Sequence, residues 1–563
     1  MIYILYFTIF WILLPFSLYV IGFYLIDPLI CGSFLSVNIL NLLPSNLIKI
    51  APFVLAIGIV LYTDAFIELL KVGKGLPVSA RPPKHLVETG PYFWVRHPLY
   101  IGFHLMLVGP ALYIGNHGFI IATGPLFLIL WILYALIEEK KLINRIGNQY
   151  RRYRRETGLI IPSLYSTARL LLIPILRLFF KLKMYNTHIV PKQGAFYIVT
   201  LHRSFLDPVF ISAGIKRKIH FLTTYSMFRS SIKRIIFKRL KTIPITRYKQ
   251  DITAIRKSIE ILTSGGIVGL FPEGGRSWYG ETVYSSSSTK LVSRYSFPIV
   301  SAEIVDNYSY YPRFSRFPKR EKIKVVYNLY KNEQANLKEI LNTLREHERK
   351  RDKQLQKLQI PADARGIEEL IYLCPECNRL FSIKGFKNGR LICTSCGKSW
   401  ILIKGKAIIP ISNPNRVFSL ENIEKTNINW LKSFIPQNIK IPCKYKIDSN
   451  NHRKSPKYTR AEILLLEREF VISPFRRIAY QWINSVLIEG NHQLEISYEN
   501  TLPQKTSSTK KKKPKDPKKS TEQIYLIIRI PPSRALFLQH LLRLKAFGDP
   551  YTRYRGSNRI VLL

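Results

Sequence analysis

The sequence is poor in cysteine and in acidic side chains, and each shortage excludes a class of protein. Only six of its 563 residues are cysteines, which excludes a secreted scaffold held together by disulfides. Only 36 residues are Asp or Glu, against 85 Lys and Arg, so the formal net charge is +49. This excess predicts anionic partners, either lipid or nucleic acid. The hydrophobic fraction of 47% excludes a largely disordered chain.

Long apolar runs are present in the first 160 residues and predict a membrane domain. The runs at 1–26 and 46–70 are each long enough to cross a bilayer, which takes about 20 residues. Two further spans are expected within 100–137, where the turn signal Gly115-Asn-His-Gly118 separates them. The first run has neither a basic start nor a small-residue cleavage site, so it does not resemble a signal peptide.

The basic residues of this region predict its orientation. Lys and Arg gather in the segments 71–96 and 140–155, and the segment 27–45 contains neither. The positive-inside rule then places the N-terminus, the 71–99 loop and everything after residue 138 in the cytoplasm. We therefore expect an integral membrane protein with four spans and cytoplasmic soluble domains.

The segment 163–345 has the pattern of a soluble α/β domain. Short apolar runs at 195–201, 266–271 and 297–301 are typical of buried strands. Helical patterns alternate with these runs, which predicts a mostly parallel sheet. At the start of the domain, residues 166–183 are amphipathic and contain Pro174. They favour a helix that lies in the membrane interface over a further span.

The first group of candidate catalytic residues follows the run at 195–201. His202 is expected in the turn after this strand, and Asp207 at the start of the next helix. Asp207 would then fix the imidazole tautomer, and His202 would act as general base on a hydroxyl. Taken alone, the pair is better explained by a structural histidine at a strand end.

A second motif, Phe271-Pro-Glu-Gly-Gly-Arg-Ser277, follows another expected buried strand. Gly274 and Gly275 let backbone amides approach an anion, and Arg276 offers a bidentate fork for phosphate. Thr242-Ile-Pro-Ile-Thr-Arg247 lies between the two motifs, and Pro298 begins a further strand.

The order and spacing of these four blocks resemble the glycerolipid acyltransferase family, which includes glycerol-3-phosphate and 1-acylglycerol-3-phosphate acyltransferases. The resemblance covers 163–345 and implies acyl transfer from a thioester of CoA or acyl-carrier protein to a glycerol hydroxyl. It implies His202 as the base and Asp207 as its orienting partner. The implied acceptor-binding residues are Arg247, Glu273, Gly274, Gly275 and Arg276.

One departure from the family pattern leaves the acceptor open. Leu201 precedes the histidine where many lysophosphatidate enzymes have Asn, and Gly275 stands where they have Thr. The HRS and EGGRS strings look more like the branch that acylates glycerol 3-phosphate or dihydroxyacetone phosphate. Glycerol 3-phosphate and a lysophospholipid both remain candidate acceptors.

A further polar group lies at one face of the membrane domain. Thr89-Gly-Pro-Tyr-Phe-Trp-Val-Arg-His-Pro-Leu-Tyr-Ile-Gly102 and Glu138-Glu-Lys-Lys-Leu142 are both expected there. Charged and histidine side chains at membrane depth are functional candidates. A sulfonium cofactor would need carboxylates for its ribose and ammonium groups, and Arg or His for its carboxylate. Topology anchors and helix caps would explain the Lys and Arg residues, but not Gly90-Pro91-Tyr92 together with His97-Pro98 and Tyr100.

The RHPLYIG and EEKKL strings resemble the integral-membrane methyltransferases that include isoprenylcysteine carboxyl methyltransferases and phospholipid N-methyltransferases. The resemblance covers 50–162. It implies S-adenosylmethionine as cofactor and leaves the methyl acceptor unspecified. The implied cofactor-binding residues are His97, Tyr100, Gly102, Glu138 and Glu139. A retained membrane anchor without methyl transfer is the alternative.

Four of the six cysteines form two CxxC pairs, Cys374/Cys377 and Cys393/Cys396. This spacing is typical of a zinc ribbon, with four thiolates in a closed structural site. Farther on, the segment 442–563 reads as a β-rich module closed by a helix near 533–547. This module faintly resembles a pleckstrin-homology-like domain.

The predicted architecture is multidomain. Its parts are a transmembrane methyltransferase-like domain (1–162), an acyltransferase domain (163–345), a helical linker (346–370), a zinc ribbon (371–410) and a basic β-rich module (411–563) with a Lys-rich loop (505–519). The basic residues are spread over all the expected cytoplasmic segments and adjoin the spans, which favours anionic lipid over nucleic acid.

The sequence therefore predicts a membrane-bound enzyme of phospholipid synthesis that acylates glycerol 3-phosphate or a lysophospholipid. A second activity, methyl transfer from S-adenosylmethionine, is expected of the membrane domain. Two alternatives stay open. One is an acyltransferase with an inactive anchor, and the other is a membrane-bound zinc-ribbon scaffold for nucleic acid or protein.

Overall fold

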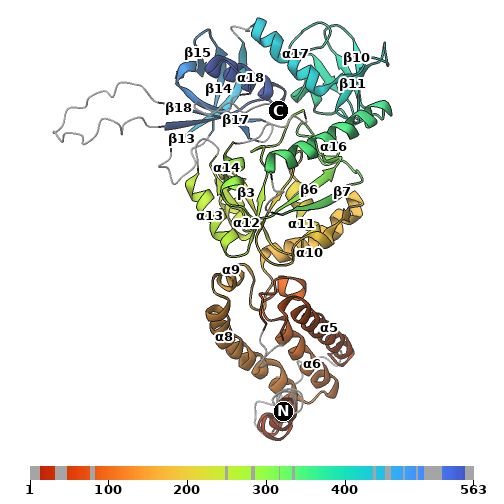
Figure 1. Ribbon diagram of the computed structural model, residues 1–563, viewed down its shortest axis with the longest axis vertical. Coiled ribbons are helices and arrows are strands. Elements are labelled where there is room, and N and C mark those ends of the chain that lie inside the picture. The colour runs from red at the N-terminus through yellow and green to blue at the C-terminus, as the bar shows by residue number, and fades with distance from the viewer. Residues whose placement is uncertain are drawn as a thin grey trace, which may run out of the picture.

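The computed structural model describes residues 13–31, 47–75, 83–246, 251–279, 286–315, 317–331, 336–434, 439–449, 458–472, 476–489, 492–499 and 523–551. Figure 1 shows three tiers along the long axis of the molecule. Apolar helices form the first tier, an α/β domain forms the second, and two antiparallel sheets form the third.

Helices form the first tier, at the N-terminal end of the chain. They are α2 (Leu14–Val20), η2 (Ile21–Ile26), α3 (Asp27–Cys31), α5 (Leu47–Glu68), η4 (Leu69–Gly73), η5 (Gly90–Phe93), α6 (Pro98–Ile114), α7 (His117–Ile121), η6 (Ala122–Leu126), α8 (Phe127–Ile146) and α9 (Asn148–Glu156). Two segments, Ile48–Gly73 and His117–Ile146, are long and apolar enough to cross a membrane. Leu14–Leu29 and Pro98–Ile114 are apolar but shorter.

The two long helices are fewer than the four spans that the sequence predicts, so the number of spans stays a prediction. Residues 1–12 of the first expected span lie outside the described residues. The third expected span corresponds to α6, which has 17 residues. The two long apolar helices indicate membrane association.

Glycines on facing surfaces let α5 and α6 approach closely. A Cβ atom added at Gly102 would lie 2.7 Å from the backbone nitrogen of Tyr62, and one at Gly58 would lie 2.8 Å from the backbone nitrogen of Met106. Larger side chains at these two positions would push the helices apart. Small residues have this role at many helix interfaces within membranes.

The second tier is built on a sheet of seven strands. The strands are β1 (Lys183–Tyr185), β2 (Phe196–Val199), β3 (Ile219–Thr224), β4 (Ile243–Ile245), β5 (Ile267–Leu270), β6 (Ile299–Val305) and β7 (Lys324–Tyr330). Their order in the sheet is β1-β7-β6-β2-β5-β3-β4. Among these strands β6 and β7 pair antiparallel, and the other neighbours pair parallel. The sheet is thus mixed, and mostly parallel as the sequence predicts.

Helices cover both faces of this sheet. The helices of this domain are α10 (Leu164–Phe180), α11 (Asp207–Gly214), α12 (Ser231–Arg239), α13 (Ile252–Thr263), α14 (Ser286–Arg294), α15 (Asn307–Tyr310) and α16 (Leu337–Lys357). Alternate residues of β2 point to opposite faces. Phe196 and Ile198 therefore pack with α10 and α11, while Tyr197 and Val199 pack with α13 and α16. Because β2, β3, β4 and β5 run parallel, their carboxyl ends meet at one edge of the sheet.

The helix α10 occupies the segment for which the sequence predicts an interfacial helix. Its outer face is apolar and exposed at Leu170, Leu171, Leu172, Ile175, Leu178 and Phe179. Pro174 lies inside the helix. This exposed apolar stripe fits a helix that rests on a membrane surface.

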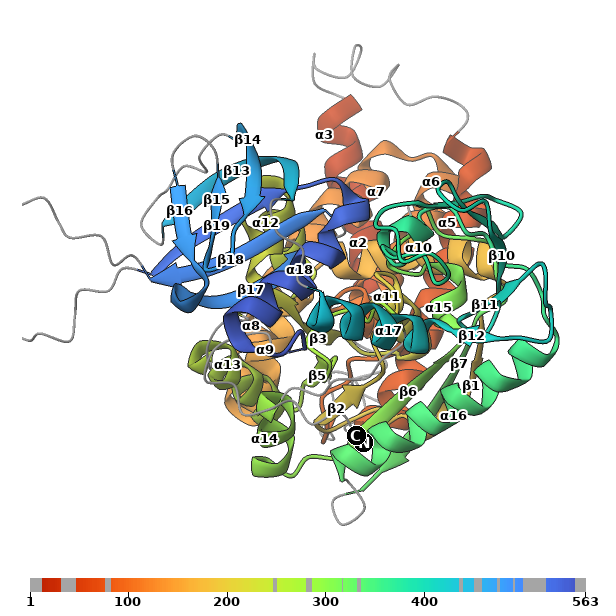
Figure 2. The same ribbon diagram turned by 90° about the horizontal axis from the view of Figure 1, so that it is seen from above.

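Two antiparallel sheets form the third tier, on either side of the view in Figure 2. The first comprises β8 (Ile383–Gly385), β9 (Arg390–Cys393), β10 (Ser399–Ile403), β11 (Ala407–Pro410) and β12 (Phe418–Ser419), followed by α17 (Leu420–Ser433). The second comprises β13 (Lys440–Ser449), β14 (Thr459–Leu465), β15 (Glu469–Ile472), β16 (Arg476–Ala479), β17 (Ile483–Glu489), β18 (Gln493–Glu499) and β19 (Gln523–Arg529).

The second antiparallel sheet has the strand order β16-β15-β14-β13-β19-β18-β17. Helix α18 (Pro532–Phe547) packs against it and closes the module. A β-rich module closed by a helix is thus present where the sequence predicts one. Its likeness to pleckstrin-homology domains stays a prediction, and the Lys-rich loop 505–519 lies outside the described residues.

Buried charges join the first two tiers. Glu88 pairs with Arg152 and Arg217, and the Arg217 contact measures 3.2 Å. Glu156 lies 3.1 Å from Arg152 and 3.0 Å from Nε2 of His220. None of these five side chains is more than 11% exposed. Since a buried charge without a partner costs several kcal/mol, the cluster fixes the α/β domain against the helical domain.

We predict that Glu156→Gln destabilises this joint by about 3–5 kcal/mol at neutral pH. Burial opposes the charge of Glu156, but His220, Arg152 and Lys218 hold its pKa at about 2, below the ordinary 4.5. A lowered carboxyl pKa stabilises the fold fully above pH 4.5, and this contribution is lost as the pH falls toward 2. Thermal unfolding of the unaltered protein and of the variant in detergent provides the measurement. The difference between their unfolding temperatures should become smaller below pH 4.5.

The matched control is Glu260→Gln. Glu260 also pairs across the two tiers, with Arg155 at 3.1 Å, but both side chains are largely exposed. Exposed pairs contribute about 0–1 kcal/mol, so this change should leave the unfolding temperature nearly unaltered. Equal destabilisation by the two variants would contradict the account of the joint.

Candidate active sites

A histidine and an aspartate meet at the carboxyl edge of the parallel sheet. His202 lies in the loop that follows β2, and Asp207 is the first residue of α11. Nδ1 of His202 lies 3.0 Å from Oδ2 of Asp207. Asp207 is fully buried, whereas the His202 side chain is 18% exposed. The ring of His202 also stacks on Phe271 from β5, with 4.1 Å between ring centroids.

Asp207 organises the loop around the histidine. Its Oδ2 accepts hydrogen bonds from the backbone amides of Arg203 at 2.9 Å and Ser204 at 2.8 Å. Its Oδ1 lies 3.3 Å from the hydroxyl of Tyr310. A carboxylate held in this way fixes the imidazole with Nδ1 as donor. The other ring nitrogen is then the one able to accept a proton.

Arg203 is fully buried beneath this loop and connects three parts of the chain. Its Nη1 donates to Oε1 of Glu273 at 2.6 Å, and its Nη2 donates to Oε2 of Glu348 at 2.8 Å. Its Nε also donates to Oε1 of Glu348 at 2.9 Å. Glu273 comes from the loop after β5, and Glu348 from α16. The pairing with Glu348 is bidentate, the geometry that suits a guanidinium best.

The five-stranded antiparallel sheet of the third tier, β8 to β12, extends this network. Nζ of Lys406, between β10 and β11, lies 2.7 Å from Glu348 and 2.9 Å from Asp352. The same ammonium lies over the ring of Tyr308, 5.3 Å from its centroid. The charges thus alternate from Glu273 through Arg203 and Glu348 to Lys406.

Charge partners decide the ionisation of these buried groups. Burial opposes the charge of Arg203, but Glu273 and Glu348 raise the pKa of its guanidinium well above the usual value. Burial likewise opposes the charge of Glu348, but Arg203 and Lys406 hold its pKa well below the usual value. Burial raises the pKa of Glu273 to about 7, against the opposing effect of Arg203. Glu348 is therefore the more constant anionic partner of Arg203.

The loop after β5 faces the histidine. Glu273 is buried, and its Oε2 accepts the backbone amide of His202 at 2.5 Å. The Ser277 amide donates to the carbonyl of His202 at 3.1 Å. Gly274 has a positive φ of 64°, which favours glycine. A Cβ atom at Gly275 would meet nothing within 4 Å, so this part of the loop borders open space.

The predicted acceptor-binding residues do not all face the histidine. Gly274, Gly275 and the half-buried Arg276 lie on the loop beside His202. Glu273 points inward and holds the histidine loop. Arg247, which comes two residues after β4 in the sequence, lies outside the described residues.

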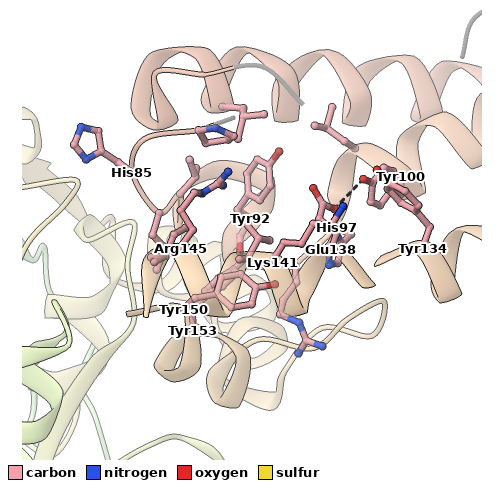
Figure 3. A pocket seen from close by; sticks show the side chains of 18 residues that line it. His85, Tyr92, His97, Tyr100, Tyr134, Glu138, Lys141, Arg145, Tyr150 and Tyr153 are labelled. Atoms are coloured by element: carbon pink, nitrogen blue, oxygen red, sulfur yellow. Dashed lines mark hydrogen bonds and ion pairs between the residues drawn. The ribbon is translucent and has the colours of Figure 1, made fainter. Parts of the chain in front are cut away.

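A second candidate site is a cavity in the helical domain, and Figure 3 shows its lining. Its volume is about 440 Å³, within the range of about 300–1,000 Å³ that cofactor sites occupy. His97, Tyr100 and Glu138 lie together at one end, while His85 and Arg145 lie at the other. The Tyr100 hydroxyl donates to Glu138 at 2.8 Å, and the rings of His97 and Tyr100 stack.

Two of the predicted cofactor residues do not line this cavity. Glu139 is 1% exposed and pairs with Arg96 at 2.5 Å and Arg154 at 3.1 Å. Gly102 is buried against α5, where its hydrogen faces Tyr62. The cavity does hold groups suited to a sulfonium cofactor. They are aromatic rings, the carboxylate of Glu138 and the cations Arg96, Lys141 and Arg145.

The CxxC pair before β8 comes together with the pair at the end of β9. The Sγ atoms of Cys374, Cys377, Cys393 and Cys396 all lie within 4.8 Å of one another. Two of the Sγ separations are 3.8 Å. A tetrahedral ion bonded to sulfur at about 2.3 Å requires S–S separations of about 3.8 Å. The four thiols could therefore hold one metal ion.

Arg203, Glu348 and Lys406 belong to the site although no sequence motif indicates their role. Arg203 stands inside the histidine motif, and its only sequence signal is that position. Glu348 is one of many charged residues on a helix with a strongly alternating charge pattern. No local pattern marks Lys406, because its contacts are set by the docking of a separate sheet.

Comparison with known proteins connects both sites to families. Residues 181–304 match the family described as Acyltransferase. Residues 47–149 match the family described as Phospholipid methyltransferase. The first match contains His202, Asp207, Glu273 and Arg276, and the second contains most of the residues around the helical cavity.

Curated relatives match one domain or the other. A protein-S-isoprenylcysteine O-methyltransferase of Schizosaccharomyces pombe is 30% identical over 112 residues, which are 19% of this chain and 46% of that protein. A 1-acyl-sn-glycerol-3-phosphate acyltransferase of Bacillus subtilis is 28% identical over 96 residues, 17% of this chain and 48% of that protein. A methanethiol S-methyltransferase of Mycobacterium tuberculosis is 42% identical over 74 residues, 13% of this chain and 28% of that protein. The chain thus spans about half, or less, of each relative.

A solved structure also matches in part. The 1-acyl-sn-glycerophosphate acyltransferase of Thermotoga maritima is 18% identical, with a TM-score of 0.27, over 32% of this chain and 78% of that one. The chain thus combines a segment similar to phospholipid methyltransferases, residues 47–149, with a segment similar to acyltransferases, residues 181–304.

Proposed function

We propose that the protein transfers an acyl group from a thioester of CoA or acyl-carrier protein to a hydroxyl of glycerol 3-phosphate or a lysophospholipid. The observation that carries the proposal is the pairing of His202 with the buried Asp207 at 3.0 Å. The acyltransferase family match supports it. So does the name of the Bacillus subtilis relative, a 1-acyl-sn-glycerol-3-phosphate acyltransferase.

The geometry suits general base catalysis. Nε2 of His202 accepts the proton of the acceptor hydroxyl while the oxygen attacks the thioester carbonyl. A C–O bond forms, the C–S bond breaks, and the imidazolium returns the proton to the departing thiolate. Asp207 holds the imidazole and stabilises its charged form, since Nδ1 donates to it. No acyl-enzyme is required.

The loop after β5 supplies the acceptor site in this proposal. Gly275 borders open space, and Arg276 would pair with the acceptor phosphate together with Arg247. We assign Glu273 a positioning role, because its carboxylate is buried against Arg203 and the amide of His202. The apolar outer face of α10 would keep this site at the membrane, where the acyl chains of substrate and product lie.

We predict that His202→Ala lowers kcat by about 10²–10⁴-fold, the usual contribution of a general base. The measurement uses purified protein in detergent, labelled acyl-CoA and a panel of acceptors, with products identified by mass spectrometry. His188→Ala, at an exposed position of the same domain, is the control and should retain activity. A product formed equally well without His202 would contradict the assignment.

We propose methyl transfer as a second activity, and the cavity of about 440 Å³ in the helical domain favours it. S-adenosylmethionine would supply an electrophilic methyl group there. His97, Tyr100 and Glu138 would hold the cofactor, with Arg96 and Arg145 available for its carboxylate. Glu139 would act indirectly, because it positions Arg96 from a buried place outside the cavity.

We predict that Glu138→Gln weakens binding of S-adenosylhomocysteine about 10-fold or more, as expected when a charge-assisted hydrogen bond is lost. Isothermal titration calorimetry in detergent provides the measurement. Lys140→Gln, on the exposed side of the same helix, should bind normally, and both variants should keep acyl transfer. If the unaltered protein binds none of this ligand, the domain is an inactive anchor.

We propose that the four thiols bind one structural Zn²⁺, since sulfur-rich tetrahedral sites favour that ion. The site has no open position, so a direct catalytic role is not assigned. Cys393→Ser should release the metal and lower the unfolding temperature, as read by elemental analysis and thermal unfolding. Cys443→Ser, at a buried free cysteine of the other sheet, should keep the metal. A chain that carries no zinc after purification without chelators would contradict this proposal.

The remaining expectations stay proposals. We place the domain boundaries at 162, 345, 370 and 410, and all parts after residue 138 in the cytoplasm. The continuous path from α8 through α9 into the α/β domain supports one side for both active sites. A scaffold that binds nucleic acid is the rival interpretation of the +49 charge, and it gains no support from the family matches.

A further inference from the structure

A basic cleft lies where the helical domain meets the α/β domain. Its volume is about 700 Å³, and its walls come from α8, α9 and α13. Three guanidinium groups line it, those of Arg151, Arg154 and Arg155 on α9, while Glu260 of α13 is its one lining carboxylate. The cleft belongs to neither active site.

The side chains of these arginines make few contacts with the rest of the protein and remain exposed to solvent. Arg155 pairs with Glu260 at 3.1 Å, but both are largely exposed, at 66% and 59%. Arg151 reaches the side chain of Asn148 at 3.5 Å. Arg154 lies 3.1 Å from Glu139, but it remains 48% exposed. Exposed contacts such as those of Arg151 and Arg155 are exchanged readily, so these two guanidinium groups can turn to a stronger anion such as phosphate, whereas Arg154 is held by the buried Glu139.

An apolar track leads along α8 to the cleft. Ile129, Leu136 and Ile143 are spaced seven residues apart and therefore share one stripe of the helix. Ile129 and Leu136 are exposed, as are Leu133 and Ile137 beside them, and Ile143 lines the cleft itself. These residues belong to a helix apolar enough to cross a membrane. The cleft thus lies at the end of an exposed apolar surface, which would bring it to the level of the lipid headgroups if α8 crosses a membrane.

We propose that this cleft binds the phosphate of an anionic phospholipid whose acyl chains lie along α8. The chemistry is that of a phosphate held by arginines above an apolar surface. Because α9 and α13 belong to different domains (Figure 1), a lipid in the cleft touches both domains at once. The inference depends on membrane insertion of α8 and on neither catalytic proposal.

The test uses the full chain in detergent and native mass spectrometry with added phosphatidylglycerol, or with phosphatidylcholine of the same acyl chains. Arg151→Gln with Arg155→Gln should weaken retention of phosphatidylglycerol about tenfold, while Arg152 of the buried cluster is kept. Lys290→Gln with Arg294→Gln is the matched control, since both lie exposed on α14, farther from the membrane-type helices (Figure 1). This control should retain the lipid.

A gain-of-function variant separates the proposal from a folding defect. Glu260→Gln removes the one lining carboxylate and should strengthen retention of phosphatidylglycerol. Equal retention of phosphatidylcholine, unaltered binding in the double arginine variant, or no effect of Glu260→Gln would overturn the proposal. Inorganic phosphate that displaces phosphatidylglycerol at micromolar concentration would also overturn it, because the site would then recognise a free anion.

Discussion

The buried guanidinium of Arg203 holds the proposed acyltransferase site together. It lies directly after His202 and is enclosed by Glu273 from one loop and Glu348 from α16. A buried charge that loses its partner costs several kcal/mol, so neither carboxylate is dispensable to the loop. Asp207 and Glu273 each accept a backbone amide of this loop. The position of the imidazole therefore depends on the ion network beneath it.

This network links the catalytic loop to residues well beyond the family match at 181–304. Lys406 of the antiparallel sheet pairs with Glu348, and Arg313 donates both to the carbonyl of Arg276 and to that of Ile488. The apolar packing agrees with these contacts. Trp278, Tyr279, Tyr308 and Phe314 share one core with residues of both antiparallel sheets. The third tier thus packs directly against the loops of the proposed acyltransferase site.

The features that could be predicted from the sequence are those that depend on local patterns. The strand before His202, Asp207 at a helix start and the spacing of the four cysteines each leave a short-range signal, and the structure has them at the expected places. Glu348 and Lys406 leave none, because 145 residues separate Glu348 from Arg203 and only the tertiary fold brings them together. Gly102 shows the opposite difficulty. Its motif predicts cofactor binding, and its contacts show in addition that it lets α5 and α6 approach closely.

The central claim is that Glu348 positions the catalytic loop from outside the acyltransferase family match. The most direct measurement compares kcat and KM for acyl transfer in Glu348→Gln and in Glu346→Gln, an exposed position on the same helix. We expect kcat to fall at least about tenfold in Glu348→Gln, with bound metal and KM for the acyl donor unchanged, and no effect in Glu346→Gln. Full activity of a folded Glu348→Gln protein would contradict the claim.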